Sequence, residues 1–416
     1  MLTTRCISIR ALRSMPNVIF RHSSQATSEI KQTSLFDFHK ENKAKMVPFA
    51  GWKMPLIYPD GMKQEHNHCR TNASIFDVSH MGQIRIHGKD GADFIESIVP
   101  GNIKDLKPNH ARLTQFTNEH GGIMDDTMVT RKSDDLLYVV VNAGCCDQDV
   151  AHIKSSLEQY KQKNPNADVS FEFMDGHSLI AIQGPVATEV VASLLPEGHN
   201  MSNVAFMSCL DVSLPALGED VQLQVSRCGY TGEDGYEISV PHQHAVALTK
   251  LLLQDERVRL AGLAARDTLR LEAGLCLMGH DMNDKITPIE ANLSFTIGKR
   301  RQEEKNFPGA EIIVQQLQNG TKIKRVGINI DTNKMVAREN YTVHDSEGNK
   351  IGYVTSGTLA PSMDNRSIAM GYVDTTHSQD GTALKVSIRN TMYDATVVKM
   401  PFVPHRYYRK PAVKKQ

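Results

Sequence analysis

Apolar residues follow two periods along residues 35–300, one typical of strands and one typical of helices. Alternating or continuously apolar runs predict strands, and spacings of three and four predict helices. The strands are expected at 82–88, 136–142, 178–184, 221–227 and 236–241. The helices are expected at 61–72, 90–99, 148–160, 187–195, 244–254 and about 258–273, with Asp90 and Asp147 as caps of two of them. Residues 46–61, rich in proline and aromatic side chains, are expected to be irregular.

Hairpins, rather than regular strand–helix–strand units, connect these elements, as in "CGYTGEDG" between the strands at 221–227 and 236–241. This arrangement predicts an α+β body rather than a doubly wound sheet. Over 305–408 the pattern changes to short strands separated by turn signals such as "SEGN". We therefore expect a C-terminal all-β domain, either a small barrel or a jelly roll.

The stretch "GGIMDDTMVT" (121–130) places two adjacent carboxylates in an apolar segment. On a strand, Asp125 shares one face with Val129, and Asp126 shares the other face with Met128. Burying a carboxylate without partners costs several kcal/mol. Either this segment is exposed, or a buried acid serves a purpose there.

Two more segments place charged residues in a predicted turn or in an otherwise apolar helix. "YTGEDGYE" (230–237) places acids in a glycine-rich hairpin, which also suits a solvated turn. "GLAARDTLRLEAG" (262–274) places Arg266 and Asp267 in a leucine-rich helix, where a surface ion pair is the simpler interpretation. Together, acids and an arginine near glycine-rich backbone favour a pocket for a polar heterocycle, because a carboxylate accepts two parallel hydrogen bonds from an N–H/NH₂ edge. They do not form a Ser–His–Asp triad, a phosphate loop or a metal cage.

Composition narrows the classes of protein that fit. The chain has 47 basic and 47 acidic residues, and this balance argues against a nucleic-acid partner. No apolar run approaches the roughly 18 residues that span a membrane. Residues 1–28 contain four arginines and no acid, a pattern typical of a mitochondrial transit peptide, with a basic tail as the alternative.

The seven cysteines show no CxxC spacing, which suits a reducing compartment. "HNHC" (66–69) has no second pair of ligands, so we do not expect a metal site there. "CC" (145–146) lacks an obvious histidine partner and is interpreted as packing.

Ten segments occur in a characteristic order: "FAGWKMP", "FDVSHMGQI", "GGIMDDTMVT", "NAGC", "RCGYTGEDGYEISVP", "GLAARDTLRLEAGLCLMGHD", "GKRR", "FPGA", "VTSGTLAPS" and "VKMPFVPHRYY". This series resembles the aminomethyltransferase (T-protein) family of the mitochondrial glycine cleavage system. The resemblance runs from about Leu35 to Tyr408, and the ordered series is far more specific than any one motif. It also agrees with the leader.

The resemblance implies a folate-binding body of two α+β lobes over 35–300 and a tetrahydrofolate-dependent reaction without a metal. The substrate is an aminomethyl group on the lipoyl arm of H-protein, and the products are ammonia, 5,10-methylenetetrahydrofolate and dihydrolipoyl H-protein. The P- and L-proteins would be functional partners, and the mitochondrial matrix the location.

The resemblance also implies roles for individual residues. Asp126, the second acid of the pair, maps to the catalytic position. The residues that map to folate or substrate binding are Glu233, Arg266 and Tyr407, with Asn142 and Met81 lining the same cavity. One departure is Phe295 in "LSFTIGKR", where relatives often have Trp, so the indole N–H is lost.

Chemistry supports the role of Asp126. An acid near the folate nitrogens positions them, assists proton transfer and stabilises a cationic one-carbon centre. Desolvation by Met124 and Met128 would raise the pKa of Asp126, whereas nearby cations would lower it, and the sequence does not decide between them. We expect Asp126 to orient and polarise folate rather than to form a covalent intermediate.

Alternative functions exist within the same superfamily. One is a folate-dependent demethylation module, which carries an upstream flavin-binding domain for which this sequence leaves no room. Another is a folate-binding scaffold or an iron–sulfur assembly protein, whose signature "KGCYxGQE" differs from "GYTGEDGYE" here. The basic run Lys299, Arg300 and Arg301 either meets an acidic carrier protein or lies in a solvated loop.

Overall fold

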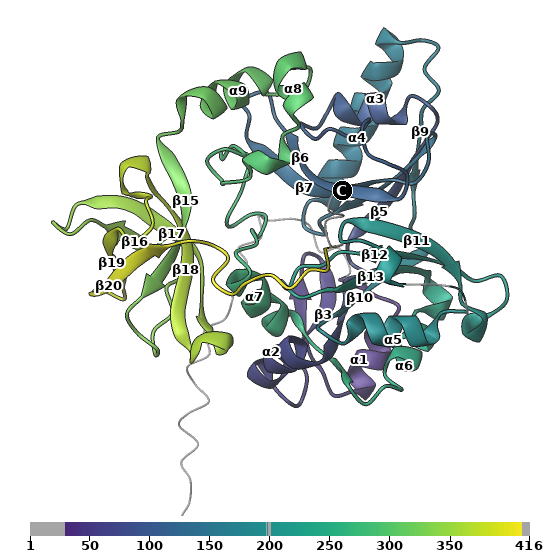
Figure 1. Cartoon of the computed structure of the whole chain (residues 1–416), viewed down its shortest axis with the longest axis horizontal. Coiled ribbons are helices and arrows are strands. Elements are labelled where there is room, and N and C mark those ends of the chain that lie inside the picture. Colours follow the sequence, from purple (N-terminus) through teal and green to yellow (C-terminus); the bar gives the residue numbers. More distant parts are fainter. Residues whose placement is uncertain (1–29, 197, 199–200, 410–416) are drawn as a thin grey trace, which may run out of the picture.

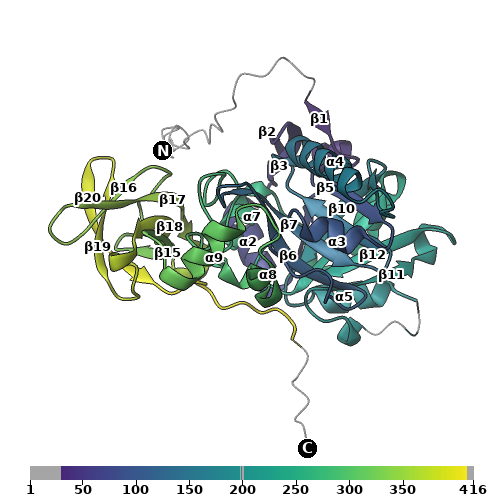
Figure 2. The ribbon, with the colours of Figure 1, turned by 90° about the horizontal axis from the view of Figure 1, so that it is seen from above.

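The computed structural model describes residues 30–196, 198 and 201–409 and has three parts (Figure 1). Two α+β lobes form one side of the molecule, and a C-terminal barrel forms the other, with helix α7 (Leu263–Glu272) between them (Figure 2). The predicted leader at 1–28 lies outside the described residues. Within the described part of the chain, no helix is long and apolar enough to cross a membrane.

The two lobes share one eleven-stranded sheet, whose halves are almost separate. One half contains β14 (Val258–Leu260), β4 (Ala73–Asp77), β10 (His177–Gln183), β13 (Gly235–Pro241), β12 (Gln222–Arg227) and β11 (Ser208–Ser213). The other contains β6 (His110–Thr117), β7 (Ile123–Arg131), β8 (Leu136–Val141), β5 (Gly82–His87) and β9 (Ser170–Phe173). A single residue pair, Ser208 with His110, is in register between β11 and β6. This weak junction divides the predicted α+β body into the expected two lobes.

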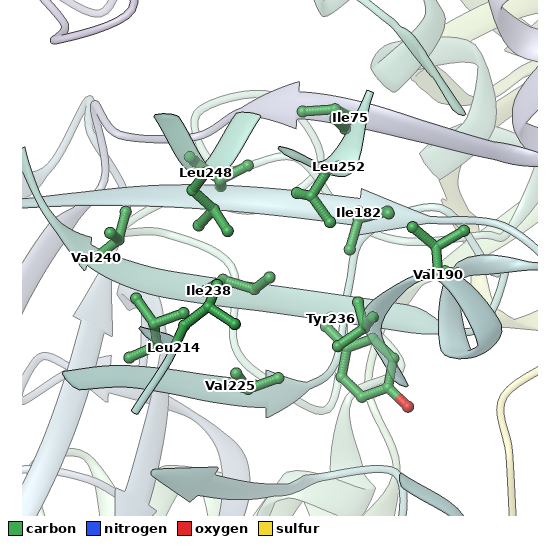
Figure 3. Close-up of a cluster of buried hydrophobic side chains, with 14 of the residues drawn as sticks. Ile75, Ile182, Val190, Leu214, Val225, Tyr236, Ile238, Val240, Leu248 and Leu252 are labelled. Carbon is green, nitrogen blue, oxygen red and sulfur yellow. The ribbon is translucent and has the colours of Figure 1, made fainter. Parts of the chain in front are cut away.

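Each lobe buries one sheet face under its own helices. In the α5–α6 lobe, helices α5 (Ala187–Leu194) and α6 (Ala245–Leu252) cover aliphatic residues such as Ile238 (Figure 3). In the α3–α4 lobe, α3 (Gly91–Glu96) and α4 (Cys146–Lys163) cover residues such as Val139. Full burial of a large aliphatic side chain is worth about 1.5–3 kcal/mol, so each lobe has its own stabilising core.

A third apolar layer lies between the lobes and α7. It joins Tyr138 and Val140 of β8, Leu179 of β10, and Ala265 and Leu269 of α7, and the half-buried Met81 and Met128 pack against it. The opposite sheet faces of the two lobes therefore meet at α7.

The C-terminal domain is a closed six-stranded barrel, which decides between the two predicted architectures. The strands are β15 (Ile323–Ile330), β18 (Arg366–Asp374), β17 (Lys350–Ala360), β16 (Thr342–His344), β19 (Ala383–Ile388) and β20 (Thr391–Val398), in spatial order. Helix α8 (Lys299–Glu304) and the unpredicted helix α9 (Ala310–Asn319) precede it. A small sheet of β1 (Lys31–Gln32), β3 (Trp52–Ile57) and β2 (Lys45–Phe49), with α1 (Phe36–Glu41) and α2 (Met62–Thr71), completes the described chain.

Some predicted elements were wrong. Residues 46–61 contain most of the β2–β3 hairpin, in which Pro55 lies beside a register shift and Pro48 lies on the edge strand β2, two positions that tolerate proline. The predicted helix at 258–273 begins with β14, which pairs in parallel with β4 and only then gives way to α7. Asp147 lies inside α4, whose N-cap is Cys145, and Asp90 occupies the N-cap of α3 but accepts its hydrogen bond from the Asp168 N–H (2.8 Å).

Two buried ion pairs hold α7 between the lobes and the barrel. Arg270 pairs with Asp281 (2.6 Å), which also accepts a hydrogen bond from the hydroxyl of Ser356 in β17 (2.9 Å). Glu272 pairs with Arg70 of α2 (2.8 Å) and accepts from the N–H of Ser362, in the turn between β17 and β18 (2.9 Å). Each pair thus ties α7 to another part of the molecule.

The environment of Glu272 predicts a pH-dependent contribution to stability. Although burial acts in the opposite direction, His66 and Arg70 lower the pKa of Glu272 from 4.5 to about 2. A shift of this size corresponds to about 3 kcal/mol. Because the folded-state pKa is the lower one, this contribution is complete above pH 4.5 and is lost as the pH falls toward 2.

We therefore expect Glu272→Gln to lower the free energy of unfolding by about 3 kcal/mol at pH 7. The difference from wild type should shrink between pH 4.5 and 2 in urea titrations. Glu189→Gln, which alters a carboxylate that is 67% exposed, is the matched control and should change stability by less than about 1 kcal/mol. A constant deficit of Glu272→Gln across that pH range would contradict this assignment.

Candidate active site

Strand β7 carries the two adjacent aspartates on opposite faces, as the alternation predicts. Asp125 is fully buried, whereas Asp126 is partly exposed and lies on the same face as Met128, toward the layer around α7. A Cβ at Gly122 would lie 1.9 Å from the carbonyl oxygen of Asp284, so this glycine lets the 284 loop close against the start of β7. The strand is therefore fixed at the end that carries the acids.

Asn142 links the two carboxylates. Its side-chain Nδ2 donates to Asp125 Oδ1 (2.9 Å) and to Asp126 Oδ1 (2.8 Å), and its backbone N–H donates to Asp125 Oδ2 (3.0 Å). Asn142 directly follows β8, which pairs with β7, so the sheet itself holds the amide in place. Both acids are thus oriented before any ligand binds.

The pKa of Asp126 lies near neutrality. Burial raises it to about 7, and the charge of Asp125 acts in the same direction. The hydrogen bond from Asn142 and the positive charge of Arg266 act against this increase. Desolvation therefore prevails over the nearby cation, which answers the question that the sequence left open, and Asp126 exchanges its proton near pH 7.

Arg266 faces Asp126 from α7 and is held without an ion-pair partner. Its guanidinium lies over the ring of Tyr230, 4.7 Å from the centroid, and forms no hydrogen bond with the described residues. The ion pair with Asp267 suggested by the sequence does not form, since Asp267 pairs with Arg270 (2.8 Å). The cation of Arg266 instead acts on Asp126 and on Glu237, where it opposes the increase in pKa that burial causes.

A small cavity of about 10 Å³ lies between the lobes near this group. Its walls include Met128, Tyr138, Leu179, Arg227, Cys228 and Glu237. Met128 is the next residue after Asp126 on the same face of β7, so the acid lies at the edge of the cavity. Asp126 and Arg266 are not among its lining residues, and apolar side chains form much of the wall.

Glu237 is a candidate ligand that the sequence analysis missed. It lines the cavity from β13, and burial raises its pKa while Arg266 and a hydrogen bond from Cys228 lower it. The signal was present: like Asp126, Glu237 is an acid inside a predicted strand, in "YEISVP". Its position beside Arg266 depends on the packing of α7 against the sheet, which the strand pattern alone does not show.

Glu233, predicted to bind folate, is engaged elsewhere. Its side chain is 1% exposed, pairs with Arg70 (2.9 Å), and lies 3.5 Å from Arg406. One carboxyl oxygen, Oε2, lacks a hydrogen bond, but Glu233 is not among the residues lining the cavity. Glu233 is thus part of an internal ion-pair network with one carboxyl oxygen left without a donor, and its contact with folate stays a prediction.

The C-terminal tail returns from the barrel to the lobes (Figure 1). Tyr407 stacks on Phe206 with ring centroids 4.1 Å apart, and burial raises its pKa to about 12. The Arg227 guanidinium lies 4.2 Å from the ring centroid of Tyr408. Because Arg227 lines the cavity, the tail borders the same space. Met81 packs against the apolar layer between the lobes and α7.

The remaining polar motifs have mostly internal roles. Arg301 is buried, Arg300 pairs with Glu96 (2.7 Å), and Lys299 is exposed. Phe295 is 72% exposed. In the part of the chain that the structure describes, no group of three His, Cys, Asp or Glu side chains is arranged to hold a metal ion.

Comparisons with known proteins agree with this architecture. The model of the GCVT N-terminal domain matches residues 35–301, and that of the glycine cleavage T-protein C-terminal barrel domain matches residues 324–404. The chain is 50% identical over 390 residues to "Aminomethyltransferase, mitochondrial" of Dictyostelium discoideum, covering 92% of this chain and 94% of that protein. It is 44% identical to the protein of the same name from Homo sapiens, covering 95% and 96%.

A solved structure extends the likeness to the fold. The glycine cleavage system aminomethyltransferase T from Bartonella henselae superposes with a TM-score of 0.83 at 36% sequence identity, and the match covers 91% of this chain and 100% of that one. The two matched domain models, the identities along nearly the whole chain and this superposition show that the protein belongs to the glycine cleavage T-protein family of aminomethyltransferases.

Proposed function

We propose that this aminomethyltransferase transfers the one-carbon unit of an aminomethyl group, carried on the lipoyl arm of H-protein, to tetrahydrofolate. The transfer releases ammonia, forms 5,10-methylenetetrahydrofolate and leaves dihydrolipoyl H-protein. The group of Asp126, Asn142 and Arg266 carries the proposal, because it combines an acid of near-neutral pKa with an unpaired cation beside a cavity.

The residues at the cavity suit a reduced pterin. Carboxylates of Asp126 and Glu237 are acceptors for ring N–H and NH₂ groups, and the unpaired guanidinium of Arg266 is a donor. Met81, Met128 and Tyr138 supply apolar and aromatic surface for the flat ring, and Tyr407 borders the space from the tail. We assign the pterin-binding carboxylate to Glu237 rather than to Glu233, whose partner is Arg70.

In this proposal Asp126 acts in its ionised form. Asn142 fixes one carboxylate oxygen, and the other is directed toward the folate nitrogens, where it orients them and stabilises positive charge at the transferred carbon. With a pKa of about 7, the same group accepts and returns a proton without a large free-energy cost. No covalent bond to the protein is required.

The location and partners follow from the family. The named relatives are mitochondrial proteins, and we extend this to the mitochondrial matrix for this chain, with the P- and L-proteins as functional partners. A folate-binding scaffold or iron–sulfur assembly protein would not need an acid of near-neutral pKa beside an unpaired arginine.

The role of Asp126 predicts a specific pH profile. Because the ionised form is active, kcat/KM should fall as the pH drops through about 7. Asp126→Asn should lower kcat by about 10²- to 10⁴-fold and abolish this acidic limb. Ammonia release from aminomethylated H-protein, measured with and without tetrahydrofolate, provides the assay, and full turnover with unchanged folate affinity in the variant would refute the role.

The two glutamates can be separated by matched substitutions. Glu237→Gln should raise the Kd for tetrahydrofolate about ten- to hundredfold, the value of one charge-assisted hydrogen bond, with a small change in melting temperature. Glu233→Gln should lower the melting temperature markedly and change the Kd for tetrahydrofolate little, because it breaks a buried ion pair with Arg70. Titration calorimetry and thermal unfolding measure the two effects, and the opposite pattern would return the folate contact to Glu233.

Docking of H-protein at the basic run is best tested at Lys299. Reversing Arg300 or Arg301 would break ion pairs within the protein, whereas Lys299 is exposed. We expect Lys299→Glu to raise the KM for H-protein about three- to tenfold at low salt and to leave the Kd for folate unchanged. Lys350→Glu, on the exposed start of β17, is the control, and equal effects of the two variants would exclude docking at this run.

A further inference from the structure

A third acid lies buried behind the aspartates of β7. Asp149 is in the first turn of α4, its side chain is 0% exposed, and neither carboxyl oxygen has a hydrogen-bond donor among the described residues. An ionised carboxylate in this position would lack any compensation, at a cost of several kcal/mol. The mechanism proposed above leaves this group without a function.

The contact with Asp125 shows where a proton must be. The carboxyl group of Asp149 lies beside that of Asp125, and neither of its oxygens has a donor among the described residues. Ionised carboxylates are acceptors only, so a hydrogen bond between the two groups requires one proton. Asp125 already accepts from the backbone N–H and side-chain Nδ2 of Asn142 (3.0 and 2.9 Å). Asp149 accepts from none of these groups, so the proton belongs on Asp149.

Two further effects on Asp149 oppose each other. The N-terminus of α4 favours an ionised group by about 0.3–1 kcal/mol. Burial and the neighbouring charges of Asp125 and Asp126 favour the protonated form and raise the pKa of Asp149 to about 10. The thiols of Cys145 and Cys146 are the other titratable groups beside it, and both are themselves protonated near neutral pH because burial raises their pKa values. The protonated form therefore prevails.

We propose that Asp149 is a positioning residue: its carboxyl group is protonated, donates a hydrogen bond to ionised Asp125, and thereby fixes the charge and orientation of the carboxylate next to Asp126. The Asp125–Asp149 pair then carries one negative charge and one proton. This charge helps to raise the pKa of Asp126 toward 7. Asn142, which donates to both Asp125 and Asp126, couples the orientation of one carboxylate to that of the other. The effect on catalysis rests on the proposed role of Asp126, whereas the proton on Asp149 does not.

Infrared spectroscopy of the full chain tests the proton directly. At pH 9 Asp126 is ionised and Asp149 is still protonated. The wild type should then show the C=O stretching band of a carboxylic acid, which shifts when aspartate, but not glutamate, is labelled with ¹³C at the carboxyl carbon. The band should persist in Asp126→Asn and in Asp147→Asn, which alters an exposed acid of the same helix, and should disappear in Asp149→Asn. Absence of the band in wild type, or its persistence in Asp149→Asn, would overturn the proposal.

Kinetics of two variants distinguish positioning from simple packing. Asp149→Leu removes the donor to Asp125 and should lower kcat about tenfold, the value of one lost buried hydrogen bond. It should also move the acidic limb of kcat/KM to lower pH, because Asp125 then takes up a proton and its charge no longer raises the pKa of Asp126. Asp149→Asn keeps an N–H donor and should recover most of the lost activity with the limb at its wild-type position.

Two kinetic outcomes would contradict the role. If Asp149 were ionised, Asp149→Asn would remove a negative charge and shift the limb to lower pH. If Asp149 only filled space, both variants would lower activity equally at every pH. If the pH profile of kcat/KM in wild type had no acidic limb, the proposed role of Asp126 would be wrong. The infrared band would still test the proton on Asp149.

Discussion

The buried ion pairs of α7 are the constraint on which the arrangement of the site depends. Arg270 with Asp281 and Glu272 with Arg70 anchor the helix to the barrel side and to α2, and removing one partner of such a pair leaves an uncompensated charge at a cost of about 3–5 kcal/mol. The other charged side chains of α7, Asp267, Arg270 and Glu272, all form ion pairs. Arg266, one turn before Arg270, has no ion-pair partner among the described residues and can therefore bind a ligand. The stability of the interface and the availability of this one cation therefore have a common origin.

The carboxyl groups around Asn142 differ in environment although their residue type is the same. Asp125 receives several donors and is fully buried, Asp149 receives none from the described residues, and Asp126 shares one donor and is partly exposed. These differences separate the protonation properties of three neighbouring aspartates, so that one of them exchanges its proton near neutral pH. A single amide, held by the β7–β8 ladder, connects the group.

The sequence contained much of the fold and part of the site. Period-two alternation located β7 and placed Asp126 on the face opposite Asp125, and the short strands and turn signals over 305–408 identified an all-β domain. It could not show that Arg70 comes from α2 to neutralise Glu233, because that contact spans 163 residues and joins segments with no common pattern. Glu237 and Asp149 were missed for a related reason: burial of a polar residue on a strand or helix depends on what packs against it, and that is decided by tertiary structure.

The central claim is that burial, more than nearby charge, brings the carboxyl group of Asp126 to near-neutral pKa. A ¹³C NMR titration of aspartate carboxyl carbons in the full chain, with Asp126→Asn used to assign the signal, measures this property without substrate. The account predicts a midpoint of about 7. A midpoint near 4, the ordinary value for an exposed aspartate, would contradict it.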